Sequence, residues 1–235
     1  MSEFHYPGGE LDDFARARNW KAYWMAQVRP FLGTRVLEVG AGIGANTVLL
    51  CNANVESWVC LEPDAKLAAR LRERIAASAF ASRVTVREST IQGIDASQWF
   101  DTVIYVDVLE HIEDDASELR DAASLLTAGG RVIVLSPAHQ WLYSPFDAAI
   151  GHYRRYSAGM LRAFSIAGMR LLRLRYLDAA GLTAALANRC LLRQSLPTNR
   201  QVTFWDRVLV PCSRVLDALF AYRVGKSILA VWEKM

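Results

Sequence analysis

Residues 35–44 read Arg-Val-Leu-Glu-Val-Gly-Ala-Gly-Ile-Gly, and this stretch decides the fold. The mostly apolar run 35–39 is typical of a short buried strand. Glycines follow at positions 40, 42 and 44. Glycine lets the backbone turn sharply and approach a ligand closely, and a helix that begins after such a turn presents unpaired N–H groups. The stretch therefore predicts a strand, a ligand-binding turn and a helix.

Apolar runs and helix-forming segments alternate on the carboxyl side of this turn. Strands are predicted at 57–61, 84–86, 101–106 and 131–135, and helices at 65–78 and 115–126. Regular alternation of strand and helix predicts a parallel sheet that is covered on both faces. We expect an α/β fold with a single doubly wound, mostly parallel, seven-stranded sheet of the Rossmann-like type.

The segments outside this alternation complete one predicted domain, residues 1–235. An amphipathic helix is predicted at 11–32, and a strand at 170–177. A helical insertion covers 179–223 and is expected to break near Pro197 and at Pro211. We divide the domain into a cofactor-binding core (34–138), an acceptor loop with a helical cap (139–224) and a final edge strand (225–234).

Composition narrows the class of protein. Of the 235 residues, 52% are hydrophobic and 22% are charged, which suits a globular protein with a large core. The net charge is +3 and the sequence contains no dense Lys/Arg run, so no nucleic-acid partner is expected. The amino-terminal residues show no signal pattern, and no apolar run approaches the roughly 18 residues of a membrane span. The four cysteines are Cys51, Cys60, Cys190 and Cys212. Their spacing predicts no metal site, and they favour a reducing cytoplasm.

Acidic residues follow the predicted strands at positions that suit a nucleoside ligand. Glu38 lies two residues before the first glycine, where its carboxylate is expected to reach a cationic amino group. Glu62 follows Gly40 by 22 positions and can accept hydrogen bonds from two ribose hydroxyls. The glycine spacing and Glu62 also fit an NAD-dependent oxidoreductase. A non-catalytic cofactor-binding protein is a further alternative.

Four segments in order, 36–44, 61–64, 101–111 and 126–131, resemble the motifs of class I S-adenosylmethionine-dependent methyltransferases. The resemblance implies S-adenosylmethionine as the cofactor and S-adenosylhomocysteine as its product. It also implies that the first acid supports the methionine end, that the glycines contact the cofactor through their backbone and that the second acid holds the ribose. The implied cofactor-binding residues are Glu38, Gly40, Ala41, Gly42, Gly44, Glu62, Pro63, Thr90, Ile91, Asp107, Val108 and His111.

The acceptor loop, residues 139–156, follows the fifth strand on the ligand side of the sheet and combines histidines, aromatic residues and arginines. His139 is the first candidate for a general base and His152 the second, with a hydrogen-bonding role as the alternative for His139. The arginine pair can hold an anionic acceptor or can pair with nearby acids such as Asp147. The predicted acceptor-binding residues are Tyr143, Asp147, Arg154, Arg155 and Tyr156.

Segments 143–147 and 151–156 of this loop resemble a bacterial subgroup of these methyltransferases that is linked with glycan and lipid-linked sugar pathways. The resemblance implies methyl transfer by in-line displacement to an oxygen or nitrogen of a small-molecule or lipid-linked acceptor. The apolar insertion packs on the core or forms a lid, a dimer face or a peripheral membrane contact. Both a monomer and a homodimer fit. The acids near His111 are interpreted as a helix start, so no metal is predicted.

Overall fold

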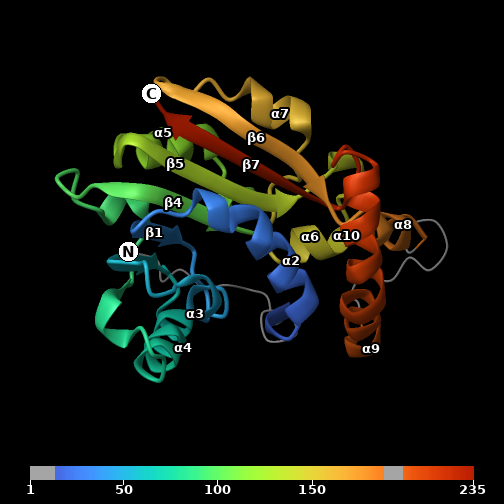
Figure 1. The fold of residues 1–235 in the computed structure, drawn as a ribbon, viewed down its shortest axis with the longest axis horizontal. Coiled ribbons are helices and arrows are strands. Elements are labelled where there is room, and N and C mark those ends of the chain that lie inside the picture. Colours follow the sequence, from blue (N-terminus) through green and yellow to red (C-terminus); the bar gives the residue numbers. More distant parts are fainter. Residues whose placement is uncertain (1–13, 188–197) are drawn as a thin grey trace.

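A seven-stranded sheet forms the centre of the computed structural model, which describes residues 14–187 and 198–235 (Figure 1). The predicted Rossmann-like α/β fold is confirmed, and the strands follow the spatial order β3-β2-β1-β4-β5-β7-β6. Their bounds are β1 Arg35–Val39, β2 Ser57–Leu61, β3 Val84–Arg87, β4 Phe100–Val106, β5 Leu126–Pro137, β6 Met169–Leu177 and β7 Ser227–Lys234.

The first five strands are parallel, and the last two are antiparallel to their neighbours. Strand β7 pairs with β5 on one side and β6 on the other, so the prediction of a final edge strand is wrong. Its residues from Ser227 to Trp232 are all buried, as a strand in the interior of a sheet requires. The edge position belongs to β6, whose side chains are mostly only partly buried.

Helices cover both faces of the sheet (Figure 1). One face packs against α2, α3, α4 and the carboxyl-terminal helices, and the other against α5 and α7. Adjacent residues of β1 serve opposite faces, with Val36 in the first core and Leu37 in the second. The helices are α2 Arg18–Val28, α3 Thr47–Leu50, α4 Ala65–Ala76, α5 Asp115–Ser124, α6 Pro145–Ala149, α7 Ala158–Ala163, α8 Ala179–Ala187, α9 Asn199–Phe204 and α10 Val210–Leu219.

The amino-terminal helix is shorter than predicted. Helix α2 begins after Ala17, whose ψ of 75° is not helical, and residues 11–13 of the prediction lie outside the described residues. No local side chain caps this helix start. Instead, the Asp206 carboxylate accepts a hydrogen bond from the Trp20 backbone N–H (2.9 Å). A residue almost two hundred positions away thus satisfies a helix end that the local sequence leaves open.

The carboxyl-terminal part of the insertion stays helical through Pro211, where a break was predicted. A π-helical segment, Trp205–Leu209, connects α9 to α10, and Pro211 falls in the first turn of α10. The wider turn before the proline accommodates a residue that cannot donate the regular backbone hydrogen bond. The predicted break near Pro197 lies outside the described residues.

Two buried aspartates attach these helices to the rest of the molecule. Asp217 accepts hydrogen bonds from the Tyr23 hydroxyl (2.7 Å) and from the backbone N–H groups of Asp178 and Ala179. The Asp178 carboxylate accepts from the Trp205 indole (2.7 Å) and the Ser213 hydroxyl (2.7 Å). Because both aspartates are fully buried, each donor is needed to offset the lost hydration of a charge.

Among the described residues, no helix is both long enough and apolar enough to cross a membrane. Cys51 and Cys60 are buried free thiols, as expected, whereas Cys212 is exposed. Cys190 lies outside the described residues.

We expect Asp217→Ala to lower the free energy of unfolding by about 3 kcal/mol, because it leaves a buried hydroxyl and two backbone N–H groups without an acceptor. Urea denaturation followed by circular dichroism measures this change. The control Glu56→Ala removes an exposed acid and should cost no more than about 0.5 kcal/mol. Equal losses in the two variants would contradict the proposed attachment.

Candidate functional site

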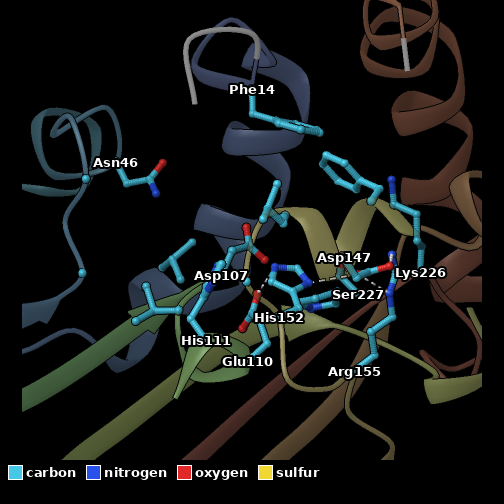
Figure 2. A pocket seen from close by; sticks show the side chains of 18 of the residues that line it. Phe14, Asn46, Asp107, Glu110, His111, Asp147, His152, Arg155, Lys226 and Ser227 are labelled. Carbon is cyan, nitrogen blue, oxygen red and sulfur yellow. Dashed lines mark hydrogen bonds and ion pairs between the residues drawn. The ribbon is translucent and has the colours of Figure 1, made fainter. Parts of the chain in front are cut away.

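A cavity of about 1440 Å³ lies at the carboxyl edge of the parallel strands and reaches under the helical cap. Its floor combines the turn after β1 with the segments that follow β2 and β4. Its walls come from the acceptor loop, α2 and the cap helices (Figure 2). The two halves of the predicted site, for cofactor and acceptor, therefore line one continuous space.

The glycine turn, Gly40–Gly44, has the predicted backbone geometry. Its three glycines have φ values of 66°, 57° and 73°, in the left-handed region that favours glycine. A Cβ at Gly40 would come within 2.6 Å of the Val108 side chain. Backbone atoms of the turn are thereby brought to the cavity wall, which Gly40, Ala41 and Gly42 line.

Glu62 is fixed against this turn. One carboxylate oxygen accepts a hydrogen bond from the Gly42 N–H (2.8 Å) and the other from the Asp64 N–H (2.9 Å). Burial raises the pKa of the Glu62 carboxyl, although these backbone hydrogen bonds oppose the shift. Each oxygen keeps further acceptor capacity. Glu62 and Pro63 both line the cavity, so the carboxylate can receive ligand hydroxyls.

Glu38 does not line the cavity, so the structure does not bring its carboxylate to a ligand's amino group as predicted. It is 2% exposed, and its carboxylate accepts hydrogen bonds from the Thr47 hydroxyl (2.6 Å) and the Trp58 indole (2.9 Å). Burial raises the pKa of the Glu38 carboxyl against these hydrogen bonds. The side chain lies behind the glycine turn and holds the start of α3 to β2.

Two other predicted cofactor contacts are absent from the cavity wall. A Cβ at Gly44 would meet Leu71 at 2.5 Å, so this glycine permits α4 to pack closely. Ile91 is 2% exposed and belongs to the core. Its neighbour Thr90 lines the cavity, as do Asp107, Val108 and His111.

On the acceptor side, Asp147 organises the loop. Its buried carboxylate accepts hydrogen bonds from His152 Nδ1 (2.9 Å) and Ser144 and makes a two-point ion pair with Arg155 (2.8 and 3.0 Å). Burial opposes ionisation, but these partners outweigh it and hold the pKa of Asp147 below its ordinary value. Asp147, His152 and Arg155 all line the cavity (Figure 2). Tyr143 also lines it and donates to the His152 carbonyl (2.6 Å).

Three predicted acceptor-side residues serve the fold instead. The His139 ring hydrogen-bonds to the Gly225 carbonyl (3.0 Å) and stacks on Tyr176, away from the cavity wall. Arg154 pairs with Asp115, which also accepts from the buried Tyr156 hydroxyl (2.7 Å). Neither Arg154 nor Tyr156 lines the cavity. The structure therefore does not bring His139, the first candidate base, or Arg154 and Tyr156, the predicted acceptor-binding residues, to the cavity.

Glu110, which the sequence analysis did not select, is fully buried beside His111 and His152. Burial, together with the nearby Asp107 charge, raises the pKa of the Glu110 carboxyl well above its ordinary value. Burial and the adjacent His152 lower the pKa of His111 to about 4. The pair Glu110-His111 after a strand was a signal, but the sequence analysis weighed His111 only with Glu113 to Asp115 and interpreted those acids as a helix start.

Lys21 was also missed, because α2 is remote in sequence from the glycine turn. It is 8% exposed, lines the cavity and donates a hydrogen bond to Asn46. Burial lowers the pKa of Lys21 to about 8, although the charges of Asp107 and Glu38 oppose the shift. The site therefore contains a cation beside the glycine turn.

Residues 37–132 match the model of a methyltransferase domain family. Nonribosomal peptide synthetase CymA of Salinispora arenicola is 34% identical over 158 residues, which covers 63% of this chain and 2% of that protein. A ubiquinone biosynthesis O-methyltransferase of Xanthomonas axonopodis is 30% identical over 154 residues, which covers 57% of this chain and 62% of that protein. The chain thus spans less than two thirds of the length of either relative.

The fold is shared with solved structures. An S-adenosylmethionine-dependent methyltransferase from Mesorhizobium loti aligns with a TM-score of 0.63 and 17% identity, covering 94% of this chain and all of that one. The ordered motifs, the domain match and this fold together make the chain similar to S-adenosylmethionine-dependent methyltransferases.

Proposed function

We propose that this protein transfers a methyl group from S-adenosylmethionine to an oxygen or nitrogen atom of a small-molecule acceptor. One observation carries the proposal. A single cavity connects the glycine turn and Glu62 with the pair Asp147–His152. The bound sulfonium supplies an activated methyl group, so the protein's main tasks are to align the acceptor and exclude water. The similarity of residues 37–132 to a methyltransferase domain favours this cofactor over NAD.

The cofactor end of the cavity offers complementary groups for each part of S-adenosylmethionine. The backbone of the glycine turn and the Glu62 carboxylate would hold the nucleoside, with Glu62 accepting from the ribose hydroxyls. Thr90 lies where the adenine would reach. Lys21 would pair with the methionine carboxylate, and Asp107 with the amino group.

At the acceptor end, His152 would activate the nucleophilic atom. Its Nδ1 forms a hydrogen bond with the Asp147 carboxylate. Because Asp147 also pairs with Arg155, this carboxylate accepts the hydrogen bond rather than donating it. The proton of this hydrogen bond therefore belongs on Nδ1, which leaves the Nε2 lone pair available. Arg155 is already paired and would serve mainly to orient the loop.

The apolar part of the cavity wall supports an acceptor with an apolar portion, such as a lipid-linked intermediate. Aromatic side chains from α2 and the cap line this part, among them Trp20, Trp24, Phe204 and Trp205. Exposed apolar residues on α10, such as Val215 and Leu219, would suit peripheral contact with a membrane surface. Vesicle co-sedimentation of the full chain tests that contact.

We expect Glu62→Ala to weaken binding of S-adenosylhomocysteine by about 1–3 kcal/mol, because the charged acceptor of the ribose hydroxyls is lost. Isothermal titration calorimetry measures the change. Glu73→Ala, at an exposed position on α4, is the matched control and should bind as the unmodified protein does. Unchanged affinity in Glu62→Ala would remove the ribose assignment.

Lys21 should make cofactor affinity depend on pH. The lysine is charged below a pKa of about 8 and loses that charge as the pH rises, so its attraction for the methionine carboxylate is present below pH 8 and fades above it. Lys21→Met should weaken S-adenosylhomocysteine binding about tenfold at pH 7. The difference in S-adenosylhomocysteine affinity between the two proteins should shrink by pH 9.5. Any titration of the ligand affects both proteins equally and therefore cancels in this difference. A constant difference would contradict the assignment.

His152→Asn should lower turnover by about 100-fold or more at unchanged S-adenosylhomocysteine affinity, because the acceptor loses its activating group. The matched control is His139→Asn, at a histidine outside the cavity, which should keep its kcat. Transfer of labelled methyl from S-adenosylmethionine to small molecules or lipids of a cell extract provides the assay. Equal kcat values for both variants would exclude an activating role for His152.

A further inference from the structure

Glu110, His111 and His152 form a compact cluster at the acceptor end of the cavity (Figure 2). The first two belong to the short 3-10 helix Leu109–His111 after β4, and His152 follows α6. One potential ligand atom from each residue lies within 4.8 Å of the others. We propose that these three side chains bind a divalent transition-metal ion that activates the acceptor. This inference rests on the proposed function and extends it to the chemistry of activation.

Glu110 provides the first independent observation. Its side chain is 0% exposed, and neither carboxylate oxygen has a hydrogen bond of ordinary geometry among the residues that the structure describes, although the Ser136 hydroxyl is near enough to favour its ionised form. A buried carboxylate without ordinary hydrogen bonds is costly, and such groups in proteins are generally paired or coordinate metals. The nearest charged partner is His152 Nε2, at 3.9 Å from Glu110 Oε1. That distance is too long for a hydrogen bond, whereas both atoms could bind one intervening cation.

The orientation of His152 provides the second observation. Asp147 accepts a hydrogen bond from His152 Nδ1, and Arg155 and Ser144 hold that carboxylate in turn. Metal-ligating histidines commonly donate their outer ring N–H to a carboxylate in this way, which fixes the ring and directs the other nitrogen at the metal. Here the other nitrogen faces Glu110.

His111 completes a set of two imidazoles and one carboxylate. Its ring lies edge to face with that of His152, with centroids 4.5 Å apart and planes at 78°. Nitrogen-rich sets of this kind suit Zn²⁺, Mn²⁺, Fe²⁺ or Co²⁺ rather than Ca²⁺ or Mg²⁺, which prefer oxygen ligands. All three residues line the cavity, so further coordination positions would face the acceptor.

A cation here would occupy the Nε2 lone pair of His152, so that His152 would activate the acceptor through the cation rather than by accepting a proton itself. The cation would lower the pKa of an acceptor hydroxyl. The hydroxyl proton passes to solvent as the oxygen becomes nucleophilic. The oxygen then forms a bond to the methyl carbon while the carbon–sulfur bond breaks, and that bond's electron pair remains on sulfur in S-adenosylhomocysteine. No oxidant or reductant is needed.

The test uses the full chain after dialysis against a chelator. Calorimetry with Mn²⁺ should show one site per chain, and Co²⁺ should give a visible absorption band. Glu110→Gln and His111→Asn should each weaken Mn²⁺ binding at least about tenfold. Glu113→Gln, an exposed acid three residues away, is the matched control and should bind Mn²⁺ as the unmodified protein does. Chelation should reduce labelled-methyl transfer, and Mn²⁺ or Zn²⁺ should restore it.

Affinity for S-adenosylhomocysteine, measured on the same samples, separates the two proposals. Absence of Mn²⁺, Zn²⁺ and Co²⁺ binding by folded protein that binds S-adenosylhomocysteine would overturn the metal site and leave the proposed function standing. Equal Mn²⁺ affinity in Glu110→Gln and the unmodified protein would also overturn it. Protein that binds Mn²⁺ but not S-adenosylhomocysteine would overturn the proposed function. Circular dichroism verifies that each variant is folded.

Discussion

The site depends on the reversal of strand order between β1 and β4. The helices that follow β1 and β2 pack on one face of the sheet, whereas α5, which follows β4, packs on the other. Because the chain leaves neighbouring strands in opposite directions, their connections diverge and leave a crevice at the carboxyl edge. The glycine turn borders this crevice on one side, and the segment that carries Glu110 and His111 borders it on the other. The cavity therefore follows from topology, before any side chain is considered.

The buried carboxylates around this cavity differ in how well hydrogen-bond donors and positive charges of the protein stabilise them. Asp217 and Asp178 are surrounded by donors and attach the cap. Asp147 pairs with Arg155 and accepts a hydrogen bond from His152. Glu62 accepts backbone N–H groups and keeps capacity for a ligand. Glu110 alone among these five has no hydrogen bond of ordinary geometry in the described part of the chain. The nearby Ser136 hydroxyl and Arg155 charge offset the burial of that acid only in part, and this imbalance lies where the acceptor would bind.

Much of the core could be predicted from the sequence because its signals are local. Apolar runs of strand length, glycines that tolerate positive φ and acids at strand ends all act within a few residues of the chain. Glu62 was identified in this way. Glu38 shows the limit of such reasoning. Its spacing from the turn suited a ligand contact, yet its carboxylate points to the core, where Trp58 and Thr47 donate hydrogen bonds to it. A spacing along the chain gives a residue's position, but the partners across the sheet determine which neighbour its side chain meets.

By itself, the sequence determined the parallel sheet, the glycine turn and the edge of the sheet at which the cavity lies, because periodicity and backbone freedom are properties of short segments. Only the tertiary structure decided that His152 and Arg155 line the cavity and that His139 and Arg154 do not. Neighbouring residues of an irregular loop have no periodicity to sort them. The directions of their side chains are set by contacts with Asp147 of the same loop, Asp115 of α5 and Tyr176 of β6. Lys21 enters the cavity for the same reason, since the packing of α2 brings together groups that no local pattern connects.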